Sequence, residues 1–261
     1  MAIIPIVGRC RDGTGGPVLE ILPKGARNRV ANRGGKGRKQ KPANTRVRFV
    51  AGFLAFFAAL WFLWDTWLVT PLKLFVVLLH EISHGLMAVA TGGTIEKIVV
   101  TPDIGGACYC GGGDAFLTLS AGYLGSLLWG AALVLLAARL SRGSSWITGA
   151  IGVFIGLVTV LYVRNAFGLV FGLGFGAALV AAARYLTPQA NRRVLWALGL
   201  TSCLYAVLDI KSDVLDRPEL HSDARMLAEM TGVPTVVWGG LWIAAALFVC
   251  WMLLRKILRQ A

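Results

Sequence analysis

Charged residues are scarce in this sequence: Asp, Glu, Lys and Arg make up 15% of its 261 residues, whereas hydrophobic residues make up 56%. An average soluble domain carries about 25% charged residues. So low a share excludes an ordinary soluble protein, because too few charged side chains remain to cover a surface that faces water. It favours helices that lie in a membrane.

Acidic residues are the rarer charged class, with 13 Asp and Glu against 26 Lys and Arg, and the net charge is +13. Residues 1–48 hold 12 of the basic residues and only two acids, Asp12 and Glu20. The basic charge is therefore local. We expect this segment to be a disordered arm, and the excess of Lys and Arg in membrane loops facing the cytoplasm places the N-terminus there.

The basic arm also lacks three features that would give it another role. It has no serine, no apolar run within its first 30 residues and no aromatic residue before Phe49. These absences argue against a transit peptide, a secretory signal and the stacking of nucleic-acid bases. We expect anionic lipid to be the partner of this arm and expect no specific nucleic acid.

Cysteine is sparse, and its five positions show no regular spacing. An odd and scattered set excludes a disulfide framework. Cys108 and Cys110 form a C-x-C pattern in a glycine-rich loop, which alone is weak evidence for metal binding or for a strained cysteine pair. The last two, Cys203 and Cys250, lie in apolar runs and are expected to be buried hydrophobic residues.

Long apolar runs follow the arm. A membrane-crossing helix needs about 20 apolar residues, with about 17 as the lower limit. The first run is short and is interrupted by Asp65, so six spans are the alternative to seven. The predicted spans are residues 49–66, 71–90, 116–138, 146–163, 166–183, 194–210 and 236–254.

These runs predict an all-α polytopic membrane protein with about seven transmembrane helices. We divide the chain into four parts: the arm, a first helix, a membrane core, and a last helix with a basic tail. Their limits are residues 1–48, 49–70, 71–235 and 236–261.

Two loops carry structure of their own. The loop 91–115 contains two β-prone stretches separated by glycine, which predict a small β-hairpin. The loop 211–235 predicts a short amphipathic helix. This helix follows His221-Ser222-Asp223. We interpret Ser222 or Asp223 as its N-cap, with a metal contact through His221 as the alternative.

Histidine is the scarcest functional residue, with three in the chain, and two of them belong to the stretch VLLHEISHGL. On a helix, His80 and His84 lie on one face and can share one metal ion. Each ionisable group inside a span costs roughly 2.5 kcal/mol or more, so three such groups within five residues need a compensating ion. The alternative is that the histidines are hydrogen-bonded packing residues.

Zinc bound by two histidines and a carboxylate keeps an open position for water. Glu81 is expected to act beside such a water as general base. The third ligand should be a carboxylate at the end of a span that runs in the same direction. Asp209 ends the run 194–210, and three spans lie between it and the histidine helix. Asp213, one turn later, is the alternative ligand.

At these residues the chain resembles the site-2 protease class of intramembrane zinc metalloproteases, and within it the compact bacterial and plant-type relatives. The resemblance covers roughly residues 71–235. It is carried by HEISH, by LSAGYLGSLLWG at residues 119–130, and by Leu208-Asp209. The sequence departs from the family pattern at Tyr123, where proline is usual, and at Ile210, where glycine is usual.

The resemblance implies a three-helix catalytic core, with the predicted hairpin beside the active site and one zinc ion per chain. The implied activity is hydrolysis of a peptide bond in or near a transmembrane segment of a membrane protein. The implied location is a membrane, with the bacterial cell membrane as the expected one. A metal-binding scaffold without proteolytic activity, or a cation transporter, is the alternative, and Glu81 distinguishes them because only the protease needs it.

The substrate backbone must be unwound before hydrolysis, because a helix hides its peptide bonds in its own hydrogen bonds. We expect the hairpin to offer an edge strand to the unwound segment. On this hypothesis Ile98 and Val100 lie on the edge that binds substrate.

Overall fold

The structure, a computed structural model, describes residues 42–64, 66–140, 143–216 and 221–260. Most of the predicted basic arm therefore lies outside the described residues. Helix α2 (Pro42–Leu63) begins within the last residues assigned to that arm. Its apolar part, Val50–Leu63, is too short to count as a membrane span, because about 17 residues are needed to cross the hydrocarbon core.

Six helices in the described part of the chain are long and apolar enough to cross a membrane. The all-α polytopic fold is thus confirmed, with the smaller of the two predicted numbers of spans. Helix α7 continues into a π-helical turn, η1 (Ser212–Asp216). The six are α3 (Thr70–Ala90), α4 (Ala115–Arg139), α5 (Ser144–Tyr162), α6 (Ala166–Tyr185), α7 (Pro188–Lys211) and α9 (Thr235–Gln260).

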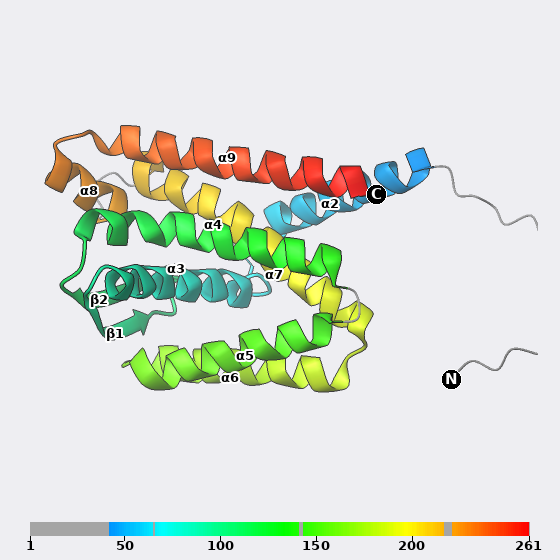
Figure 1. Ribbon diagram of the computed structural model, residues 1–261, viewed down its shortest axis with the longest axis horizontal. Helices are drawn as coiled ribbons and strands as arrows, with labels where there is room; N and C mark the ends of the chain where they lie inside the picture. Colours follow the sequence, from blue (N-terminus) through cyan, green and yellow to red (C-terminus); the bar gives the residue numbers. More distant parts are fainter. Residues whose placement is uncertain (1–41, 65, 141–142, 217–220, 261) are drawn as a thin grey trace, which may run out of the picture. The chain divides into compact units, whose positions relative to one another are not determined.

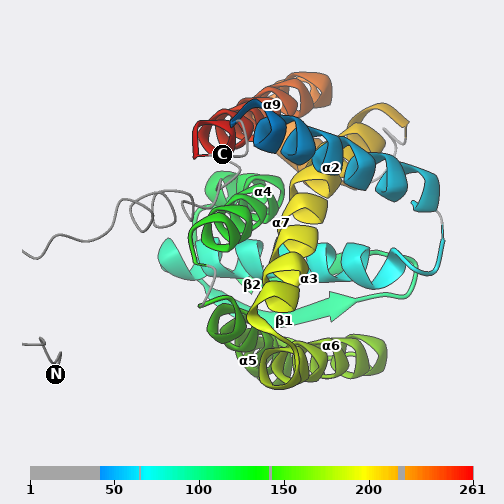
Figure 2. The same ribbon diagram turned by 90° about the vertical axis from the view of Figure 1, so that its right-hand side faces the viewer.

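Helix α3 lies at the centre of the bundle. Figures 1 and 2 show α4 on one side of it and the α5–α6 pair on the other, and in Figure 2 α7 crosses in front of it. The buried share of the most apolar segment is 72% in α3, 56% in α4 and 50% in α7, against 22–28% in α5, α6 and α9. The three most buried helices are those predicted to form the core.

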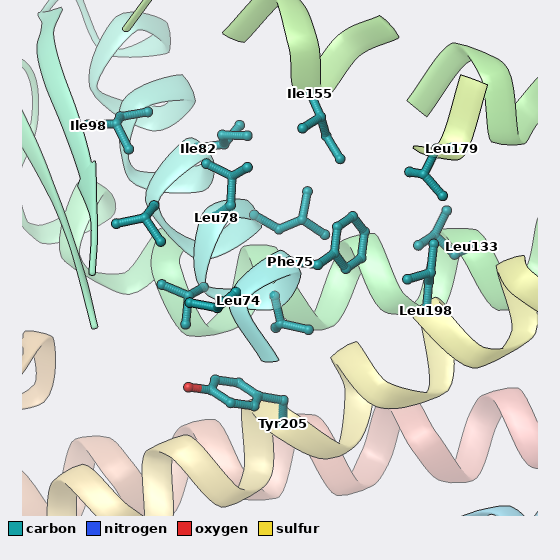
Figure 3. Close-up of a cluster of buried hydrophobic side chains, with 14 of the residues drawn as sticks. Leu74, Phe75, Leu78, Ile82, Ile98, Leu133, Ile155, Leu179, Leu198 and Tyr205 are labelled. Atoms are coloured by element: carbon teal, nitrogen blue, oxygen red, sulfur yellow. The ribbon is translucent and has the colours of Figure 1, made fainter. Parts of the chain in front are cut away.

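The main hydrophobic core surrounds α3. Phe75, Leu78 and Ile82 project from α3 into a cluster that receives side chains from five neighbouring elements (Figure 3). Phe75 stacks on Phe175 of α6 with the ring centroids 5.2 Å apart. Lipid tails are as apolar as these side chains, so close van der Waals packing within the cluster is what holds α3. The neighbours in Figure 3 are Ile98, Leu133, Ile155, Leu179 and Leu198.

The predicted hairpin is present as β1 (Thr94–Val100) and β2 (Gly106–Gly111), paired antiparallel. It folds back along α3, because Gly85 lies against Ile95 while Gly106 lies against Val77 and Glu81. The strands therefore lie beside the middle of a membrane-spanning helix. At that depth every backbone polar group needs a partner.

The outer edge of β1 is already paired. In an antiparallel ladder, alternate residues direct N–H and C=O away from the partner strand. The N–H of Arg164 donates to the Ile98 oxygen at 3.0 Å. The side chain of Asn165 accepts from the Val100 N–H at 3.2 Å and donates to the Val100 oxygen at 2.7 Å.

This pairing corrects the expectation that Ile98 and Val100 present an edge to substrate. Both side chains are buried, and the edge of β1 is covered by the α5–α6 connection. The open edge belongs to β2 instead. By the same alternation it is formed by Gly106, Cys108 and Cys110.

The predicted short amphipathic helix is α8 (Asp223–Thr231). The Ser222 hydroxyl caps it by accepting the N–H of Arg225 at 3.3 Å, and Gly232 ends it in the left-handed conformation. Ala224 and Leu227 are fully buried in a cluster with Tyr123 of α4 and residues of α7, η1 and α9. This cluster fixes α8 against the core helices.

Candidate metal centre

His80 and His84 lie one turn apart near the middle of α3, as their spacing predicts. Their ring centroids are 4.7 Å apart, and the rings are nearly perpendicular. Only 12% of the His80 side chain and 8% of the His84 side chain is exposed. Two buried imidazoles on one helix face form half of a metal site.

The carboxylate beside the two imidazoles is that of Asp223, the first residue of α8. Its Oδ2 lies 2.9 Å from Nε2 of His80 and 3.1 Å from Nε2 of His84. Among the described residues these three form a group whose ligand atoms all lie within 4.8 Å of one another. They are the candidate metal ligands.

The two imidazoles also set the charge of this carboxylate. Burial alone would raise the pKa of the Asp223 carboxyl, but the adjacent His84 and His80 outweigh burial and hold that pKa below its usual range. Asp223 is therefore an anion at neutral pH. An anionic oxygen is the form of the side chain that binds a cation.

The hydrogen bond of His84 tests whether a metal fits. Nδ1 of His84 lies 2.7 Å from the main-chain oxygen of Thr118. Because that oxygen can only accept, Nδ1 carries a proton and the neutral ring has a lone pair on Nε2. Nε2 faces the Asp223 carboxylate at 3.1 Å, so the space between them takes a cation: the second proton of an imidazolium, whose charge lowers the pKa of Asp223, or a metal ion. A carbonyl that fixes the tautomer is the usual support of a metal-ligating histidine.

The donor set suits zinc in particular. Two imidazole nitrogens and one carboxylate oxygen are a common set for catalytic zinc, which leaves a fourth position open. In the described chain, Asp223 and the two histidines offer these three donors from helices α3 and α8. The residues therefore fit a zinc ion.

Gly122 of α4 provides the space that this site needs. A Cβ atom at Gly122 would contact Nε2 of both His80 and His84. Glycine is thus required here for the close approach of α4 to the imidazoles. Gly122 belongs to the motif at residues 119–130, but the sequence alone does not reveal that it lies against the histidines.

Glu81 lies beside the three ligands and is not one of them. Its carboxylate lies beside Cys108 on the open edge of β2. A Cβ at Gly106 would lie 2.5 Å from Glu81 Oε1, so a side chain at that strand position would displace the carboxylate. The Glu81 side chain is 6% exposed and lines the same cavity as the histidines. Its carboxylate therefore faces the same space as the candidate metal ligands.

Asp209 and Asp213 were the predicted third ligands, and the structure does not bring either into the group of three. Both line the same cavity. Asp213 accepts a hydrogen bond from the Tyr123 hydroxyl at 2.6 Å, and the Tyr123 ring lies edge-on to His80 at 5.0 Å. Both carboxylates thus lie near the candidate site without being among its ligands. Asp223 is the third candidate ligand, the role predicted for Asp209.

Asp223 was missed because the prediction considered span ends alone. After η1 the described chain lies at the cavity again with Ser222 and Asp223, and sequence spacing does not reveal this. One signal was available. Ser222 serves as the N-cap, which leaves the Asp223 side chain available for another role.

A cavity of about 1150 Å³ opens beside these groups. One wall carries the histidines and Glu81, and another is the open edge of β2 from Gly106 to Tyr109. The cavity extends past Asp209 to Lys73 and Trp64, where the Lys73 ammonium lies 4.4 Å from the centre of the Trp64 ring. It is large enough to hold several residues of an extended peptide.

Fold and site together define an integral membrane protein with a His-His-Asp candidate metal site and an adjacent glutamate. Comparison with protein families agrees: the chain belongs to the Peptidase M50B-like family, whose model matches residues 53–253. Neither the curated proteins nor the solved structures include a match. Family membership indicates a membrane metallopeptidase.

Proposed function

We propose that the protein is a zinc-dependent intramembrane protease that hydrolyses a peptide bond in or near a transmembrane segment of another membrane protein. One observation carries the proposal. His80, His84 and Asp223 converge on one point, and Glu81, which is not a ligand, lies between that point and an open strand edge. A structural metal site has no need of such a glutamate.

Each residue has a role in the proposed reaction. His80, His84 and Asp223 would hold one zinc ion per chain, and zinc supplies a Lewis acid that activates water and polarises a carbonyl. The Thr118 oxygen fixes the His84 ring. Glu81 accepts a proton from the attacking water and returns it to the leaving amine.

The substrate would bind as an added strand on the open edge of β2. An unwound transmembrane segment has free N–H and C=O groups, which cannot stay unpaired at membrane depth. The backbone groups of Gly106 and Cys110 and the oxygen of Cys108 face away from β1 and can pair with them, while the Cys108 N–H faces Glu81. Because β2 also forms the wall next to Glu81, a strand added there has its peptide bonds beside the general base.

The experiment that tests this function has two steps. The first measures zinc in the detergent-purified protein, where about one zinc per chain is expected. The second places the protein in liposomes with a panel of single-span membrane proteins and identifies cleavage products by mass spectrometry. Glu81→Gln should retain zinc and lose on the order of 10²–10⁴-fold in rate. Cleavage at an undiminished rate by Glu81→Gln would reject the assigned role.

Zinc retained without cleavage of any panel member would instead favour a metal-binding scaffold or a transporter. A flux assay with zinc-loaded liposomes then separates these two. Movement of zinc that depends on His80 would identify a transporter.

We also propose that the N-terminus is cytoplasmic and that the basic arm binds anionic lipid in the bacterial cell membrane. The charge of residues 1–48 supports both points. Protease digestion of inside-out and right-side-out vesicles, read with an N-terminal tag, tests the orientation. Digestion of the tag in right-side-out vesicles would show that the N-terminus lies outside the cytoplasm and would contradict the proposed orientation.

A further inference from the structure

Two thiols meet on the open edge strand. Cys108 and Cys110 alternate along β2, so both side chains point to the same face of the strand. Their Sγ atoms are 2.8 Å apart, and both residues are free cysteines that are half-buried. An S–S bond is about 2.05 Å long, so less than 1 Å of movement separates the two sulfurs from bonding distance.

This thiol pair lies next to the catalytic groups. Glu81 lies beside the backbone of Cys108, and Cys108 Sγ lies 3.5 Å from where a Cβ of Gly85 would be. The two cysteines also supply two of the three residues on the open edge of β2. A change in the backbone at these positions therefore reaches both the general base and the proposed binding edge.

We propose that Cys108 and Cys110 form a reversible disulfide, and that this modification distorts the open edge of β2 and so suppresses substrate docking. The part of this proposal that concerns docking rests on the proposed function. The modification itself does not.

Strand geometry explains why the bond would alter the edge. Residues two apart in a strand are about 6.6 Å apart at Cα, whereas bridged cysteines are most often about 5.5–6 Å apart. Closing the bridge shortens the strand between the cysteines and pushes Tyr109 outward. The backbone groups at positions 108 and 110 then lose the straight alignment that an added strand requires.

The oxidant would be a low-molecular-weight disulfide, for which oxidised glutathione is the probe. The Cys110 thiolate attacks one sulfur of oxidised glutathione, which forms a mixed disulfide and releases one glutathione thiolate. The Cys108 thiolate then attacks Sγ of Cys110 and releases the second glutathione. Two protein thiols are oxidised, one oxidised glutathione is reduced to two thiols, and two protons leave the protein.

The surroundings of the two thiols predict how fast this occurs. Burial raises the pKa of Cys108 and of Cys110 above that of an ordinary thiol. Both are therefore protonated at neutral pH, and only the thiolate attacks. Formation of the disulfide should be slow at pH 7 and faster at pH 9.

The first experiment measures the modification in the unmodified full-length protein. The purified protein is treated with oxidised glutathione, remaining thiols are alkylated, and the chain is cleaved before Asp103 and Asp114. The resulting peptide, residues 103–113, contains Cys108 and Cys110 and no other cysteine. A mass about 2 Da below the dithiol peptide, restored by dithiothreitol, is expected.

Two results of this experiment would overturn the proposal. Two alkylated cysteines after prolonged oxidation would show that the thiols do not join. A peptide carrying glutathione, about 305 Da heavier, would show that the second exchange step fails. Neither result depends on whether the protein cleaves a substrate.

The second experiment measures the consequence in liposomes, as the ratio of cleavage rates with and without oxidised glutathione. The rate should fall at least about tenfold in the unmodified protein and recover with dithiothreitol, while zinc content stays the same. In Cys110→Ser the ratio should stay near one, whatever the basal rate. If the disulfide forms and the cleavage rate does not change, the modification is confirmed and its proposed effect on substrate docking is rejected.

Discussion

Asp223 Oδ2 lies 2.9 Å from Nε2 of His80, although 143 positions separate the two residues in the sequence. Asp223 is the first residue of α8, a helix of nine residues that lies outside the membrane spans. The candidate site is thus completed by a short segment that must dock on the core helices. Its docking depends on Ala224 and Leu227, which are fully buried against α4, α7 and α9.

The first prediction concerns the third ligand. Asp223→Asn should lose zinc, because an amide is a poor ligand and cannot supply the negative charge that zinc favours. Asp209→Asn should keep about one zinc per chain. Elemental analysis of the two purified variants beside the unmodified protein measures this. Zinc lost from Asp209→Asn and retained in Asp223→Asn would restore the assignment made from sequence alone.

A second prediction concerns the space beside the imidazoles. Gly122→Ala should reduce zinc to a small fraction of one ion per chain, because the added methyl group contacts Nε2 of both histidines. Gly156→Ala is the matched control: Gly156 lies in helix α5, and a Cβ there would have no atom within 4 Å. Zinc titration of both variants gives the comparison. Full zinc binding by Gly122→Ala would mean that α4 does not approach the site this closely.

The helices were predictable because the apolar runs are long and each is bounded by a clear polar break. The predicted span 116–138 corresponds to α4, which begins after its N-cap Asp114, and 194–210 lies within α7, which begins at Pro188 after its N-cap Thr187. His80 and His84 were predictable for the same reason, since their spacing matters only within one helix. Local patterns therefore gave the fold class and half of the candidate site.

The remainder depended on contacts between distant segments. Asp209 was a reasonable ligand by the direction of its helix, but Asp223, at the start of α8, is the carboxylate beside the histidines. Similarly, β1 reads as an edge strand in sequence, and its edge is covered only because Asn165 follows α5 in the chain. Neither of these two contacts between distant segments leaves a periodic pattern in the sequence.

A third prediction tests that covering of β1. Asn165 makes two hydrogen bonds to the backbone of Val100, and it does not use its side chain to cap α6. Asn165→Ala should leave a buried N–H and C=O without this partner, which costs roughly 1–3 kcal/mol. A lower melting temperature of the detergent-purified protein should report this. Asn165→Asp, which keeps the acceptor and loses the donor, should also be destabilised. An unchanged melting temperature in both variants would contradict the pairing.

The last prediction tests which strand edge binds substrate. The N–H of Cys110 faces away from β1 by the alternation of the ladder, so proline at this position removes a binding group and leaves the β1 pairing in place. Cys110→Ser is the reference, because it removes the thiol and keeps the N–H. Cleavage by Cys110→Pro should be at least about tenfold slower than by Cys110→Ser, with equal zinc in the two. Equal rates would show that substrate does not pair with this edge, and the unwound segment would then have to be held by side chains of the cavity wall instead.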